Sequence, residues 1–230
     1  MAEPGSYQPW RNGVHVKVAV LSSGGKDSSA AIWWAQCKGW DVTHLVTVLI
    51  AGDDSMMFQI PGTSLVEKQA DLCGCLWLPV HTMGVENEEV EDLKQALAKL
   101  DINGIVSGAL KSDYQKTRLE RICNDLDIKS FTPLWHQSSE SHMDNLVANG
   151  FKVMITGVSA EGLGSEWLGR ILDENFLLEL KSSASEYRFH VDGEGGEYET
   201  LVVAGPHMNG RLELEYETHW DGVRGQLLFH

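Results

Sequence analysis

Residues 22–29 read SSGGKDSS and combine the residue types that bind phosphate groups. Two adjacent glycines let a backbone approach a ligand closely and adopt positive φ. The neighbouring serine hydroxyls add hydrogen-bond donors, and a lysine adds a positive charge. The spacing matches neither G-x-x-x-x-G-K-[ST] nor G-x-G-x-x-G. We therefore predict a phosphate site of another kind, made of Ser22, Ser23, Gly24, Gly25, Lys26, Asp27 and Ser28.

Asp27 is unusual in such a loop, because a carboxylate next to a bound phosphate is repelled unless a cation lies between them. Two roles remain open. Asp27 either contacts Mg²⁺ bound with the phosphates, or caps the helix that follows.

A second polar stretch, SGALKSDYQKTRLE, begins at Ser107. Ser112 and Gln115 form the pattern of a capping box, and Lys111, Gln115 and Arg118 have the spacing of one helix face. Lys111 and Arg118 are the predicted cations for charge stabilisation. We expect Ser107 and Gly108 to lie beside the bound nucleotide.

A third stretch, GEGGEYETLVV (193–203), contains three closely spaced carboxylates: Glu194 in a turn, and Glu197 and Glu199 on one face of a strand. Crowded carboxylates repel one another unless they bind a cation. A cation or metal site is the favoured interpretation, and a solvated turn is the alternative.

The elements around these stretches alternate between β and α patterns through the first 135 residues. We expect strands at 16–21, 42–50, 76–81, 104–109 and 129–135, with helices at 27–38, 63–73, 86–100 and 113–126. This alternation predicts an α/β fold, a Rossmann-like parallel sheet with helices on both faces. Ligands of such sheets bind at the carboxyl ends of the strands, where residues 22–28 and 107–111 would lie.

The second half predicts a smaller α+β domain, so we divide the chain into 1–135 and 136–230. Its expected helices are 139–149 and 170–181, and its expected strands are 152–159, 187–191, 197–203, 211–218 and 223–229. No Pro- or Ser-rich linker separates the halves, so we expect them to pack closely.

Charge and composition exclude several classes of protein. The net charge is −15, which argues against a general nucleic-acid binder. Residues 137–230 hold 6 basic and 16 acidic residues, which favours a cationic partner or substrate. No apolar run is long enough to span a membrane, and from the opening residues we expect no secretory signal. The cysteines match no disulfide or zinc pattern, so we expect a cytoplasmic location with Cys73 and Cys75 as core residues.

The residues SGGKDS (23–28) resemble the PP-loop of the ATP-pyrophosphatases. The resemblance implies a PP-loop (HUP-type) domain in which the loop binds the β,γ end of ATP with Mg²⁺. The α-phosphate is attacked, pyrophosphate leaves, and a nucleophile then displaces AMP from the adenylated substrate.

The stretches SGALKSDYQKTRLE and GEGGEYETLV are more specific, and with the loop they resemble the diphthine–ammonia ligase family from about Lys17 to beyond Leu201. This resemblance implies amidation of diphthine on translation elongation factor 2, with ATP and ammonium as the other substrates. We expect no glutaminase domain within 230 residues that the two predicted domains already fill, which agrees with ammonium as the nitrogen donor. Gln59 and Gly62 depart from the histidine and asparagine that similar proteins tend to carry there.

Diphthine carries a quaternary ammonium, which carboxylates and aromatic faces would bind. The predicted substrate residues are Tyr114, Trp135, Trp167, Glu194 and Tyr198, and Glu197 or Glu199 is the predicted proton acceptor from ammonium. We expect structural or surface roles for His136, His142 and His207. Two other functions remain open: a PP-loop enzyme that modifies tRNA, and a non-catalytic adenine-nucleotide-binding module.

Overall fold

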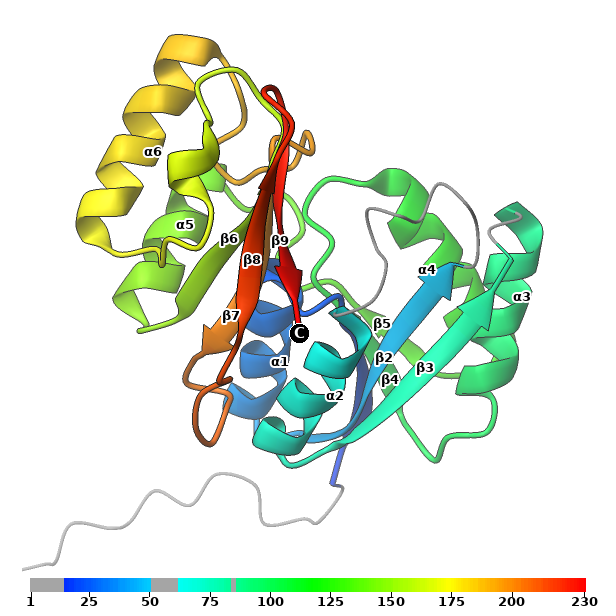
Figure 1. Ribbon diagram of the computed structural model, residues 1–230. Coiled ribbons are helices and arrows are strands. Elements are labelled where there is room, and N and C mark those ends of the chain that lie inside the picture. Colours follow the sequence, from blue (N-terminus) through cyan, green and yellow to red (C-terminus); the bar gives the residue numbers. More distant parts are fainter. Residues whose placement is uncertain (1–14, 51–61, 84–85) are drawn as a thin grey trace, which may run out of the picture.

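Two β-sheets with helices around them form the protein (Figure 1). The computed structural model describes residues 15–50, 62–83 and 86–230. The first half contains β1 (Lys17–Leu21), α1 (Lys26–Cys37), β2 (Asp41–Ile50), α2 (Gly62–Cys73), β3 (Leu76–Thr82), α3 (Glu86–Leu97), β4 (Gly104–Ser107), α4 (Asp113–Asp125) and β5 (Lys129–Phe131). The second half contains α5 (Ser139–Ala148), β6 (Lys152–Val158), the short 3₁₀ helix η2 (Ser165–Trp167), α6 (Glu174–Tyr187), β7 (Tyr198–Ala204), β8 (Tyr216–Trp220) and β9 (Gly225–Phe229).

The first sheet has the strand order β3-β2-β1-β4-β5 and all its neighbours are parallel. Helices α1 and α2 pack on one face and α3 and α4 on the other, each over its own apolar core. The predicted Rossmann-like fold is thereby confirmed. The strand order reverses direction between β1 and β4, which is where ligands bind in sheets of this kind.

The second sheet is antiparallel with the order β7-β6-β9-β8. Helices α5 and α6 cover one of its faces (Figure 1). The expected strand at 187–191 is wrong, because α6 continues to Tyr187 and ends with Arg188 in the left-handed conformation. The expected helix at 170–181 begins later, since Asp173 caps it by accepting a hydrogen bond from the backbone N–H of Phe176 at 2.7 Å.

The two halves share a core. Leu65 of α2 belongs to the apolar cluster of the second half, and Trp33 of α1 contacts Phe151 edge to face, with ring centroids 5.7 Å apart. Helix α1 thus lies between the two sheets (Figure 1). The close packing expected from the missing linker is present, while the boundary at 135/136 stays a prediction.

Two further features of the described residues bear on function. No helix among them is long and apolar enough to cross a membrane. The cysteines are free, and Cys73 and Cys75 pack against the apolar cores, as expected from the sequence.

Candidate active site

The segment 22–28, called the phosphate loop below, follows the carboxyl end of β1 and includes the first turn of α1, which begins at Lys26. Gly24 adopts φ +82°, and a Cβ there would lie 3.1 Å from the Oε1 atom of Gln69. The Gly24 carbonyl accepts hydrogen bonds from the backbone N–H of Val202 and from Nε2 of Gln69, both at 3.0 Å. The glycine at position 24 is thus explained in part by its positive φ and by close packing against the rest of the protein.

Strand β7 of the second half contacts the same loop. The backbone N–H of Lys26 donates to the hydroxyl of Thr200 at 3.2 Å, and Gln69 also donates to the Val202 carbonyl at 2.7 Å. Loop geometry therefore depends on both halves of the chain. Sequence reasoning missed Gln69 and Thr200, which carry no local signal because their partners are 45 and 174 residues away.

The serines of the loop support its shape in this structure. Ser22 accepts from the Gly24 N–H at 3.2 Å, and Ser28 donates to the Gly25 carbonyl at 3.1 Å. Ser23 is exposed. The assignment of these residues to ATP binding remains a prediction.

Gly108 packs against the loop from the end of β4. A Cβ at Gly108 would lie 2.5 Å from the carbonyl carbon and oxygen of Asp27 and 2.8 Å from the nitrogen of Ser28. Ser107 pairs in register with Leu21, the last residue of β1. The structure therefore brings Ser107 and Gly108 to the loop, as expected from the sequence.

Asp27 is the second residue of α1 and does not cap it, so the capping alternative is wrong; the cap position is Gly25. One carboxylate oxygen lies 2.8 Å from Nζ of Lys26, and the other lies 2.7 Å from Nε2 of His142. Burial alone would raise the pKa of Asp27. The hydrogen bond with His142 and the charge of Lys26 outweigh it, so the pKa lies below its usual value.

His142 is a site residue that the sequence did not reveal. It lies on α5 with 2 % of its surface exposed, and its ring crosses from the second half to the phosphate loop. Since Asp27 is ionised, the contact requires the proton on Nε2. An isolated histidine in an amphipathic helix gives no pattern that would single it out.

Lys111 precedes α4 and does not share a helix face with Arg118, contrary to the prediction. Its ammonium donates to Ser139 at 2.9 Å and lies 3.6 Å from the carboxylate of Asp192. Ser139 lies one helical turn before His142. The amino-terminal turn of α5 therefore contacts both Lys111 and Asp27.

The other predicted groups on α4 form aromatic contacts. The guanidinium of Arg118 lies 3.7 Å from the ring centroid of Tyr114, which is exposed, and Lys116 lies 5.0 Å from the ring of Trp135. The side chain of Gln115 and the position of Gln59 lie outside what the structure describes. The roles of Arg118, Tyr114 and Trp135 remain predictions.

The three glutamates do not converge on one ion. Glu197 accepts hydrogen bonds from the backbone N–H groups of His190 and Gly195, each at 2.8 Å, and so holds the turn. Among the described residues, no cluster of three or more His, Cys, Asp or Glu side chains could hold a metal ion. This geometry does not support a metal site made of the three glutamates, and Glu197 has a structural explanation. The interpretation of Glu194 and Glu199 as groups that bind a cation remains a prediction.

Glu194 and Glu199 remain exposed to solvent, but each is partly desolvated and interacts electrostatically with Lys26 and Asp27 of the loop. Loss of water raises the pKa of the Glu194 carboxyl, and the charge of Asp27 raises it further. Loss of water also raises the pKa of Glu199, while Lys26 opposes the change. These carboxylates thus lie in the field of the phosphate loop.

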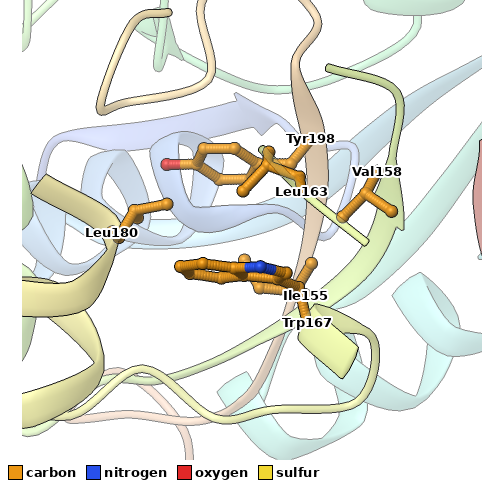
Figure 2. Close-up of a pocket in the computed structure, with 6 residues that line it drawn as sticks. All are labelled: Ile155, Val158, Leu163, Trp167, Leu180 and Tyr198. Atoms are coloured by element: carbon orange, nitrogen blue, oxygen red, sulfur yellow. The ribbon is translucent and has the colours of Figure 1, made fainter. Parts of the chain in front are cut away.

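Trp167 and Tyr198 lie in the core of the second half, with 8 % and 4 % of their surfaces exposed. Figure 2 shows them packed among Ile155, Val158, Leu163 and Leu180. The Tyr198 hydroxyl donates to the Val191 carbonyl at 2.6 Å. The open aromatic face that the substrate prediction required is absent at these two residues, because Tyr198 begins β7 with its side chain in the core and Trp167 is buried at the end of η2.

The glycine- and serine-rich loop lies at the switch point of a parallel sheet and precedes a helix with Lys26 and Asp27 in its first turn. This is the arrangement expected of an α/β protein of the PP-loop class. Comparison with protein families identifies the family within this class. Residues 16–130 match the diphthamide synthase N-terminal domain, and residues 138–230 match the diphthamide synthase C-terminal domain. The chain belongs to the diphthine–ammonia ligase (diphthamide synthase) family.

Individual relatives support the same family assignment. The diphthine–ammonia ligases of Bos taurus and Homo sapiens are each 32% identical over 228 residues, covering 87% of this chain and 83% of theirs. The Schizosaccharomyces pombe enzyme of the same name is 31% identical, and the match covers 36% of that longer protein. Among solved structures, a predicted subunit of tRNA methyltransferase from Methanocaldococcus jannaschii aligns with a TM-score of 0.46 at 19% identity, over 83% of this chain and 98% of that one.

Proposed function

We propose that this protein is an ATP-dependent ligase that amidates diphthine on translation elongation factor 2. ATP, ammonium and the diphthine carboxylate would give the amide, AMP and pyrophosphate. The observation that carries the proposal is the match to both diphthamide synthase domains, which together span 16–130 and 138–230. Because translation takes place in the cytosol, the protein would act there.

In the first step, the diphthine carboxylate would attack the α-phosphate of ATP, forming a C–O–P linkage as pyrophosphate leaves. No general base is needed, because the carboxylate is ionised at neutral pH. The work of the protein is positioning and charge stabilisation. The loop 22–28 would hold the triphosphate, with Lys26 and Lys111 as the nearby cations.

Mg²⁺ would accompany the phosphates and spread their negative charge. Asp27 is the residue that would contact it, since a carboxylate with two donors retains further lone pairs. Mg²⁺ commonly uses one or two carboxylates together with phosphate oxygens, and Asp27 would supply one of them. His142 would keep Asp27 oriented toward the loop.

In the second step, ammonia would attack the acyl-adenylate carbonyl, forming the C–N bond as the bond to AMP breaks. The nitrogen must lose a proton to become neutral ammonia, and Glu199 remains the candidate acceptor. The raised pKa of Glu199 makes that carboxylate a better base than an ordinary glutamate.

The test is an assay of AMP and pyrophosphate release with ATP, ammonium and elongation factor 2 that carries diphthine. The expected result is one AMP and one pyrophosphate for each amide formed, seen as a loss of about one mass unit from the factor. Matched reactions with unmodified elongation factor 2 should release neither product.

A further inference from the structure

Asp192, in the turn before β7, is the most deeply buried carboxylate among the described residues. Its exposed fraction is 0%, and neither carboxylate oxygen accepts a hydrogen bond. Removing a carboxylate from water without hydrogen bonds is costly. If Asp192 served only to fill space, an apolar side chain of similar size would make the protein more stable. The buried carboxylate is therefore better explained by a ligand that donates hydrogen bonds to it.

The contact with Lys111 does not meet this need. Nζ of Lys111 lies 3.6 Å from Oδ2 of Asp192, too far for a good hydrogen bond, and donates instead to Ser139. The side chain of Lys111 is 43% exposed, whereas the side chain of Asp192 is 0% exposed. A primary ammonium group therefore reaches the carboxylate from the solvent side and leaves both oxygens able to accept.

The surroundings carry excess negative charge. The carboxylate of Glu194 interacts electrostatically with those of Asp27 and Asp192. The positive charges nearby are those of Lys26 and Lys111. Bound MgATP would add further negative charge. The region between the loop and the turn 190–197 therefore favours a small cation.

We propose that Asp192 binds the ammonium ion consumed in the reaction, which makes this inference dependent on the proposed function. Ammonium has four N–H donors and is small enough for a buried site, so it can donate to both orphaned oxygens. A quaternary ammonium has no N–H to donate. A divalent metal would need more ligand side chains than the described residues bring together.

The experiment separates the two half-reactions of the full-length protein. ATP–pyrophosphate exchange with diphthine-bearing elongation factor 2 reports adenylation without ammonium, and amide formation at increasing ammonium chloride reports the second step. Asp192→Asn should leave the exchange rate and the KM for ATP unchanged. The KM for ammonium should rise about 10- to 100-fold, the effect of losing a hydrogen bond to a charged group.

Asp144→Asn is the matched control. Asp144 accepts a hydrogen bond from Lys181 at 2.6 Å, and its side chain is 56% exposed. This variant removes an aspartate paired with a lysine on the protein surface, and its KM for ammonium should equal that of the wild type.

An unchanged KM for ammonium in folded Asp192→Asn would overturn the proposal. An equal fall in exchange and amidation would also overturn it, since Asp192 would then act by positioning Lys111. If the variant does not fold, amide hydrogen exchange measured on the wild-type protein tests the ammonium site instead. Ammonium chloride should slow exchange of the amides in 190–197 and tetramethylammonium chloride should not, and equal exchange in both salts would refute the site. Slowed exchange in a wild type that releases no AMP would instead refute the proposed function.

Discussion

Replacing Gly108 by alanine tests whether the end of β4 positions the phosphate loop. The new Cβ would lie 2.5 Å from the backbone of Asp27, while carbon atoms in contact lie about 3.5–4.0 Å apart. The backbone at the start of α1 must therefore move by about 1 Å relative to β4. A displacement of this size at a reacting site lowers the rate about 100-fold, and overpacking lowers the free energy of unfolding by about 1–3 kcal/mol.

The same strand offers a matched control. A Cβ at Gly104 would lie 2.7 Å from the Lys129 carbonyl oxygen and from the ring of Phe131, at the other end of β4. Gly104→Ala should therefore lose stability by a similar amount while leaving the loop in place. Urea unfolding would measure stability, calorimetry would measure ATP affinity, and pyrophosphate release would measure the rate. Equal ATP affinity and equal rate in the two variants would refute the positioning role of Gly108.

Three further predictions follow from single side chains. His142→Phe should lower ATP-dependent pyrophosphate release about 10- to 100-fold, because Asp27 loses its 2.7 Å hydrogen-bond partner; wild-type kinetics in this variant would contradict the role. Glu197→Ala should lower the free energy of unfolding by about 1–3 kcal/mol in urea, because two backbone N–H groups lose their acceptor, and an unchanged midpoint would show that the turn does not need it. Burial lowers the pKa of His207 from 6.5 to about 4, so the unfolded state binds a proton first as the pH falls. The wild type should therefore lose about 2 kcal/mol more stability between pH 7 and pH 5 than His207→Phe, and parallel pH profiles would refute this.

The first sheet and its loop were predictable because their signals are local. Short β-branched runs alternate with helical patterns, and glycines and serines mark the strand end at 22–28. The strand order β3-β2-β1-β4-β5 was not predicted, because connection rules for parallel sheets leave several orders open. The family resemblance likewise depended on contiguous stretches, chiefly those beginning at Ser107 and Gly193.

The polar contacts across the two halves were not predictable, because they join residues far apart in sequence. His142 and Asp192 look ordinary in the sequence, and only folding brings one to Asp27 and buries the other near Lys111. Glu197 was misread because a carboxylate that accepts two turn N–H groups has the same local sequence as one that binds a cation. Trp167 and Tyr198 were misread because aromatic residues suit both a core and a substrate face.

The most direct test of the account is product analysis with ATP, ammonium and diphthine-bearing elongation factor 2. The account predicts AMP, pyrophosphate and the amidated factor in equal amounts, with all three lost when ATP is omitted. ATP binding without pyrophosphate release, or release stimulated by tRNA and not by the factor, would contradict it.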